Sequence, residues 1–113
     1  MLDWKKTIQD INDRLKELSA HTPDTLRGAA LLAGAGAKNN HLSAKTRELI
    51  ALAVAVTTRC DGCIAVHSAE AVKLGVSNEE MAEALGVAIY LNTGAAMVYS
   101  THVLDAMDKL KQG

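Results

Sequence analysis

The amino-acid sequence predicts an all-α protein that forms one compact bundle of about six short helices. Alanine, the strongest helix former, occurs 19 times among the 113 residues, whereas Phe is absent and there are only one Trp and two Tyr. With few aromatic side chains to fill wide gaps, the helices should approach one another closely through small residues. The length suits a single hydrophobic core, so we expect residues 1–113 to form one domain.

Apolar periodicity indicates the first helix, and Thr22 with Pro23 indicates the start of the second. Apolar residues recur at alternating steps of four and three, the spacing of one helical face, at Trp4, Ile8, Ile11, Leu15 and Leu18. Thr22 is placed to cap a second helix, and Pro23 suits its first position because no N–H is needed there. This second helix is rich in small residues and should end near residues 38–40.

The third and fourth helices are expected on either side of a tight turn. Ser43 should cap a third helix, which contains Glu48 and the apolar run of residues 49–56. That run also fits a buried strand, but its alanines and its distance from the cap favour a buried helix. Residues 59–62 are typical of a turn that opens a fourth helix, which should close at Gly75.

Two more helices complete the predicted bundle. Ser77 and Glu80 have the capping-box spacing that begins a fifth helix. Residues 92–94, Asn-Thr-Gly, should break it before a sixth helix that contains His102. Several helices, notably the third, are apolar on more than one face. This predicts burial between the subunits of a homo-oligomer as well as within one subunit.

Charge and hydropathy exclude several kinds of partner. The net charge is −1 and no basic cluster occurs, so we expect no nucleic-acid partner. The longest apolar run, residues 49–56, is too short to span a bilayer, and the amino terminus lacks the apolar stretch of a signal peptide. We therefore expect a cytoplasmic protein without a membrane partner. Reducing conditions there disfavour a purely structural disulfide, so two close cysteines indicate redox or metal chemistry.

The chemistry is expected on one face of the fourth helix. Residues three and four apart on a helix are surface neighbours, so Cys60, Cys63 and His67 share a face. The two cysteines can come within disulfide reach. His67 lies one turn beyond Cys63, where an imidazole can accept a thiol proton.

Glu48 is expected to assist His67 from the third helix. Antiparallel pairing of the third and fourth helices places Glu48 about 6 Å from His67 along the axis, a gap that its side chain or one water can cover. A carboxylate beside the imidazole would raise its basicity and fix its orientation. The predicted proton relay therefore runs from Glu48 to His67 to Cys63.

Two arguments bear on which cysteine attacks. Cys60 lies nearer the amino terminus of the helix, where free N–H groups stabilise a thiolate. His67 favours Cys63, because a base four residues away serves that thiol specifically. We expect Cys63 to attack and Cys60 to resolve, with the reverse order left open.

The spacing of Glu48, the cysteine pair and His67 resembles the alkylhydroperoxidase D-like proteins of the carboxymuconolactone decarboxylase family. The similarity extends over residues 42–107, including Arg-Glu-Leu-Ile at 47–50 and Gly-Ala-Ala at 94–96. It implies a catalytic set of Glu48, Cys60, Cys63 and His67, in which Cys63 attacks the peroxide and Cys60 resolves. It also implies a helical subunit that assembles as trimers or hexamers. The implied activity is reduction of a hydroperoxide without haem, flavin or metal, followed by recharging with an external dithiol.

The chain departs from alkylhydroperoxidase D in two respects. That protein is longer, has two related halves and carries a second histidine between its cysteines, where this chain has Gly62. The chain is therefore similar to the single-repeat branch of the family. The decarboxylase branch generally lacks the cysteine pair, which argues against lactone decarboxylation.

Two alternatives to a hydroperoxide reductase stay open. The same cysteine pair would serve a general dithiol–disulfide oxidoreductase or a redox sensor. The less favoured alternative is a non-catalytic helical oligomer whose cysteines merely pack or bind zinc. The zinc ligands would be Cys60, Cys63 and His67, with Glu48 or His102 as the fourth. Structural zinc sites usually draw on two separated ligand pairs, and no second pair occurs here.

Overall fold

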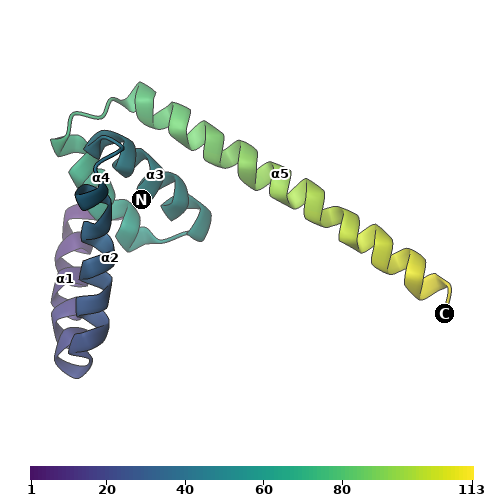
Figure 1. Ribbon diagram of the computed structural model, residues 1–113, viewed down its shortest axis with the longest axis horizontal. Coiled ribbons are helices and arrows are strands. Elements are labelled where there is room, and N and C mark those ends of the chain that lie inside the picture. The colour runs from purple at the N-terminus through teal and green to yellow at the C-terminus, as the bar shows by residue number, and fades with distance from the viewer.

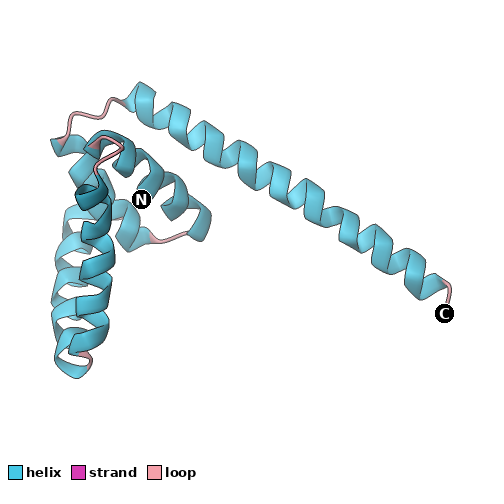
Figure 2. Cartoon of the chain, viewed as in Figure 1, coloured by secondary structure: helices cyan, strands magenta, loops and turns pink.

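The computed structural model describes residues 1–113 and consists of five α-helices joined by short turns (Figures 1 and 2). These helices are α1 (Trp4–His21), α2 (Pro23–Asn39), α3 (Ala44–Thr58), α4 (Asp61–Lys73) and α5 (Asn78–Lys111). No strand occurs, so the predicted all-α class is confirmed. The apolar run at 49–56 is helical, as its alanines indicated.

The predicted break at residues 92–94 is wrong, because α5 runs through them as one helix of 34 residues. Side chains of this segment form hydrogen bonds that the helix accommodates. The Asn92 amide donates to the Ala88 carbonyl at 2.7 Å, and the Thr93 hydroxyl donates to the Ile89 carbonyl at 2.9 Å. Both bonds reach back four residues within the helix, so the polar side chains do not compete with its backbone bonds. The chain therefore has five helices, and the expected fifth and sixth are one.

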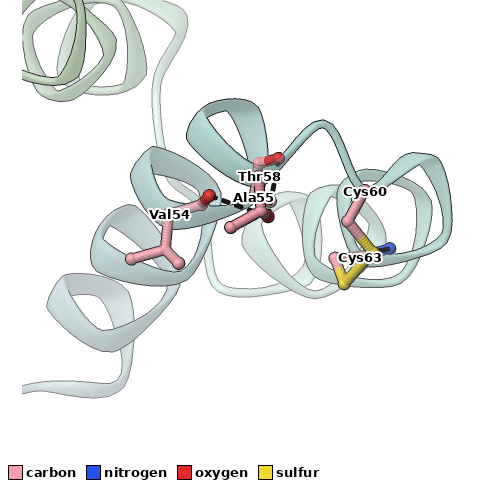
Figure 3. The surroundings of a disulfide bond; sticks show 5 residues. All are labelled: Val54, Ala55, Thr58, Cys60 and Cys63. Atoms are coloured by element: carbon pink, nitrogen blue, oxygen red, sulfur yellow. Dashed lines mark hydrogen bonds between the residues drawn. A yellow bond between two sulfur atoms is a disulfide. The ribbon is translucent and has the colours of Figure 1, made fainter. Parts of the chain in front are cut away.

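The turn between α3 and α4 follows the prediction (Figure 3). The hydroxyl of Thr58 donates to the Val54 carbonyl at 3.1 Å in the last turn of α3. Arg59 then adopts a left-handed conformation with φ 57°, and Cys60 is extended. At the other end of α4, Gly75 has φ +76°, a conformation that suits glycine at a helix end.

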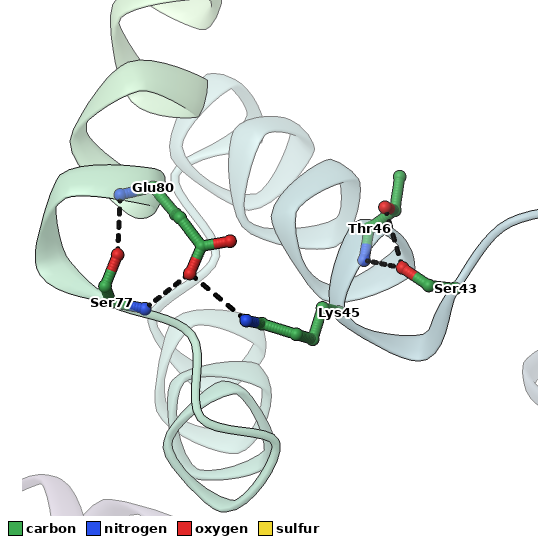
Figure 4. Close-up of polar contacts among 5 residues, drawn as sticks. All are labelled: Ser43, Lys45, Thr46, Ser77 and Glu80. Carbon is green, nitrogen blue, oxygen red and sulfur yellow. Dashed lines mark hydrogen bonds and ion pairs between the residues drawn. The ribbon is translucent and has the colours of Figure 1, made fainter.

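Three predicted caps have different outcomes. Ser43 accepts the N–H of Thr46 at 3.1 Å, and Ser77 forms the predicted capping box with Glu80 (Figure 4). Lys45, at the start of α3, is paired with the Glu80 carboxylate at 3.2 Å, which ties the first turns of α3 and α5 together. Thr22 does not cap α2 through its side chain, because its hydroxyl instead pairs with that of Thr25 at 2.6 Å.

Helix α3 lies at the centre of the fold and packs against α4 and α5, while α1 packs against α2 and α4. The buried residues are few, and all belong to α3, α4 and α5: Leu52, Ala55, Ala65, Ala71 and Ala88. Four of these five are alanines, so the helices do approach one another through small side chains, as the composition predicted.

The second half of α5 projects away from the other helices (Figure 1). The radius of gyration is 18.8 Å, compared with about 13 Å for a compact domain of this size. The projecting segment carries exposed apolar side chains, among them Tyr99 at 71%, Val103 at 59% and Leu110 at 80% exposure. By length and composition alone, α5 would also be able to cross a membrane, a test that core helices of other proteins pass as well. The expectation from the short run at 49–56 did not include this longer helix.

Candidate redox site

The cysteine pair lies at the amino-terminal end of α4 and forms a disulfide (Figure 3). Cys60 is the N-cap residue, and its Sγ accepts the backbone N–H of Cys63 at 3.1 Å. The two Cα atoms are 5.2 Å apart, within the range of ordinary disulfides. The left-handed Arg59 makes this placement possible, because it turns the chain sharply enough for Cys60 to begin the next helix.

The two sulfur-bearing residues differ in exposure. Cys63 is exposed to solvent, whereas Cys60 is half-buried. A reactant in solution therefore has its more open approach to Cys63. The amide that Cys60 Sγ accepts belongs to the first turn of α4, so a thiolate on Cys60 would also be stabilised there.

Glu48 and His67 contact each other directly across α3 and α4. Glu48 Oε2 lies 2.7 Å from His67 Nδ1, so no bridging water is needed. The Glu48 side chain is 15% exposed and that of His67 is 40% exposed. A carboxylate only accepts hydrogen bonds, which assigns the proton to Nδ1 and leaves Nε2 of a neutral imidazole with its lone pair free.

His67 and Cys63 are one helical turn apart on α4, as the sequence places them, but no hydrogen bond joins the imidazole to either sulfur in the disulfide state. A disulfide sulfur carries no proton for the imidazole to accept. The structure therefore places the four predicted residues as two bonded pairs: Cys60 with Cys63 at the start of α4, and Glu48 of α3 with His67 one turn further along α4.

The structure does not assemble the zinc site that was considered. No group of three or more His, Cys, Asp or Glu side chains is placed to hold a metal ion. His102, the suggested fourth ligand, lies on the projecting half of α5, where its ring packs against Tyr99 with centroids 4.4 Å apart. Within one chain, neither residue reaches the cysteine pair.

An apolar cavity of about 210 Å³ lies between α3, α4 and α5. The sequence predicts a narrow apolar pocket walled by Leu52, Ala55 and residues of the last helix. Leu52 does line the cavity, together with Met81 and Leu85 of α5, but Ala55 does not. None of the four candidate site residues lines it either. On α4 the cavity meets Ile64, Ser68, Ala71 and Val72, which lie on the face next to the one that carries Cys63 and His67.

One neighbour of the cysteine pair was not anticipated from the sequence. A Cβ atom placed on Gly62 would lie 2.7 Å from Cδ1 of Ile11, closer than side-chain carbons approach each other. Helix α1 therefore packs directly against Gly62, one of the two residues between the cysteines. The periodicity of α1 marked Ile11 as facing the interior, but it did not identify which element Ile11 meets.

Together these features describe an all-helical protein with a disulfide-forming cysteine pair beside a bonded Glu–His pair. Residues 23–106 match the carboxymuconolactone decarboxylase family, and the chain belongs to this family. The family includes alkylhydroperoxidase D-like peroxidases as well as decarboxylases.

Similar proteins occur in several bacteria. An uncharacterized protein of Haemophilus influenzae is 51% identical over 104 residues, which cover 92% of each chain. An uncharacterized protein of Cupriavidus necator is 29% identical over 96% of each chain. The fold is similar to the crystal structure of the apo form of a carboxymuconolactone decarboxylase family protein from Legionella pneumophila. That structure has a TM-score of 0.73 and 37% identity, with 94% of this chain and 95% of that chain covered.

Proposed function

We propose that the protein is a thiol-dependent hydroperoxide reductase in which Cys63 attacks the peroxide and Cys60 resolves the product. The observation that carries this proposal is the exposed Cys63, disulfide-bonded to Cys60 and one turn from a histidine that Glu48 holds. Membership of a family that includes peroxidases of this kind supports it. The cysteine pair itself argues against lactone decarboxylation.

The first step consumes the hydroperoxide. Nε2 of His67, free because Nδ1 is engaged by Glu48, accepts the proton of the Cys63 thiol. The thiolate attacks one oxygen of the O–O bond and becomes a sulfenic acid, while the other oxygen leaves as an alkoxide. The imidazolium returns its proton to this leaving group, so the product is an alcohol. Glu48 stabilises the imidazolium that forms in between.

The second step restores a disulfide, and a third resets it. The Cys60 thiol loses its proton and its sulfur attacks the sulfenic sulfur of Cys63. The S–S bond forms, the S–O bond breaks, and the hydroxyl takes up that proton and leaves as water. An external dithiol then exchanges with this disulfide and is itself oxidised, which returns both cysteines to the reduced state. The sum is one hydroperoxide and one dithiol converted to an alcohol, water and one oxidised dithiol. No metal or organic cofactor takes part in these steps.

Substitution of each cysteine tests the proposal. In a steady-state assay with several hydroperoxides and a dithiol donor, Cys63→Ser should abolish peroxide consumption. Cys60→Ser should consume one equivalent and stop, and mass spectrometry with a sulfenic-acid trap should find the adduct on Cys63. A Cys63→Ser protein with full turnover would contradict the assignment. Exchange of the two phenotypes would show that Cys60 attacks.

A general dithiol–disulfide oxidoreductase or redox sensor is the second candidate, favoured by the exposure of Cys63, which leaves it open to a protein thiol as well as to a peroxide. The two functions differ in their preferred oxidant. If the reduced protein reacts faster with disulfides than with hydroperoxides, and its reduction potential lies near that of known dithiol exchange proteins, the second candidate holds.

We also propose that the protein is a cytoplasmic homo-oligomer, of three or six subunits as the family resemblance implies. Support comes from one stripe of α5. Met81, Leu85, Ala88 and Asn92 face α3 within the chain, and the same helical spacing continues through Ala95, Tyr99, Val103, Ala106 and Leu110. Helix α3 has 15 residues, about 22 Å, and α5 has 34, about 51 Å. The apolar face beyond the end of α3 therefore suits a second copy of the chain.

A further inference from the structure

The approach to Cys63 is bounded by two different helices. Successive residues of an α-helix are turned by about 100°, so Gly62 faces to one side of Cys63. Ile11 of α1 lies on that side, since its Cδ1 would be 2.7 Å from a Cβ at Gly62. On the other side, His67 is joined to Glu48 of α3. The exposed strip of α4 that carries Cys63 thus lies between α1 and α3.

The two boundaries differ in their position relative to the family match. The match to the carboxymuconolactone decarboxylase family begins at residue 23, so it includes α3 and the whole site but not α1. The wall on the α3 side is therefore part of the shared family core. The wall on the α1 side is contributed by a segment outside the match, and it occupies the space that any side chain at residue 62 would fill.

We infer that Ile11 is a specificity-determining residue, which narrows the approach to Cys63 and selects slender hydroperoxides and thiols over bulky ones. The substrate class named in this inference rests on the proposed function. The width of the approach to Cys63 depends only on the fold. Ile11 acts sterically, since its side chain carries no polar group. Val66 and Glu70 are exposed and lie on the same strip of α4 as Cys63. The approach to Cys63 along this strip is therefore open to solvent.

The contact between Ile11 and Gly62 is tested by a double-mutant cycle. Ile11→Val removes the Cδ1 methyl that faces Gly62, and Gly62→Ala adds a Cβ at the same place. We expect Gly62→Ala to lower the thermal midpoint of unfolding in the parent and to lower it clearly less in the Ile11→Val background. Additive effects would overturn the contact. Gly28→Ala is the matched control, because nothing lies within 4 Å of its added Cβ.

Access is measured by alkylation of the reduced Cys60→Ser protein, in which Cys63 is the only thiol. Iodoacetamide serves as the slender reagent and fluorescein maleimide as the bulky one. We expect Ile11→Val to increase the rate of alkylation by the bulky reagent and Ile11→Ala to increase it further, by several-fold. The rate of alkylation by iodoacetamide should stay almost unchanged in both variants. Leu15→Ala, one turn further along α1, should change neither rate.

The outcomes separate this inference from the proposed function. Equal acceleration of both reagents would indicate general loosening of α1, and no acceleration would show that Ile11 does not bound the approach; either result overturns the inference. Alkylation requires no peroxide turnover, so a protein inactive toward peroxides would still report the width of the approach. Unchanged alkylation rates in the Ile11 variants, together with normal peroxide reduction by the parent, would overturn this inference and leave the proposed function standing.

Discussion

Glu48 and His67, 19 residues apart in the sequence, are joined by a 2.7 Å hydrogen bond between Oε2 and Nδ1 that links α3 to α4. The carboxylate is largely shielded, at 15% exposure, while the imidazole is 40% exposed. The bond fixes which nitrogen of His67 carries the proton and holds the other nitrogen free. The bond links a carboxylate on one helix to an imidazole on the next, one turn beyond Cys63.

Replacement of Glu48 by Gln should lower the rate of peroxide reduction by about 100-fold, the usual contribution of a general base. A glutamine amide can donate to Nδ1, which would reverse the tautomer and occupy Nε2 with a proton. In a His67→Ala background, Glu48→Gln should have almost no further effect, because the carboxylate acts through the imidazole. Additive losses in stopped-flow measurements would contradict this arrangement.

Removal of the Asn92 side chain should destabilise the fold by about 1 kcal/mol, the net worth of a hydrogen bond. Its amide donates to the Thr57 hydroxyl at 2.9 Å and so ties α5 to the last turn of α3. Urea unfolding of Asn92→Ala measures the loss. Thr93→Ala is the control, since its hydroxyl bonds only within α5 and should have the smaller effect.

Acid should weaken the junction between α3 and α5 through Glu80. The backbone N–H of Ser77 and the ammonium of Lys45 lower the pKa of Glu80 below its ordinary value. Its contribution to stability is therefore complete above the pKa of the unfolded chain and is lost as the pH falls through the lower folded value.

Urea unfolding at neutral pH and at about pH 3 measures this effect. The parent should lose more of its unfolding free energy on acidification than Glu80→Gln does. Glu79→Gln, which changes a neighbouring carboxylate outside the capping box, should behave as the parent does. Parallel losses in all three proteins would show that Glu80 is not responsible.

A charge on the projecting half of α5 should disrupt the proposed oligomer. Val103 is 59% exposed in one chain and lies on the stripe that continues from the α3-facing residues. An unpaired carboxylate buried there costs several kcal/mol, so Val103→Glu should weaken association by more than about 100-fold.

Sedimentation velocity reports the assembly directly. Val103→Glu should sediment as a monomer at concentrations where the parent is an oligomer. Thr101→Glu, on the opposite side of the same helix, should assemble as the parent does. A monomeric parent would refute the proposed assembly altogether.

Local interactions explain which parts of the fold could be predicted. The caps at Ser43 and Ser77 and the turn at residues 59–62 depend on residues within four positions of each other, so the sequence indicated them correctly. The face shared by Cys60, Cys63 and His67 follows from helical periodicity alone. The predicted break at residues 92–94 was wrong because Asn92 and Thr93 also fit a long helix when their side chains bond to it or to a neighbour.

Only the tertiary structure decided the relations between distant segments. The length of the Glu48–His67 contact, the placement of Ile11 on Gly62 and the projection of α5 beyond α3 all depend on how helices pack. Apolar periodicity shows that a helical face will be covered, but any apolar surface of suitable shape satisfies that need. The sequence therefore determined most of the helix ends and the helical face that Cys60, Cys63 and His67 share, and packing determined what surrounds them.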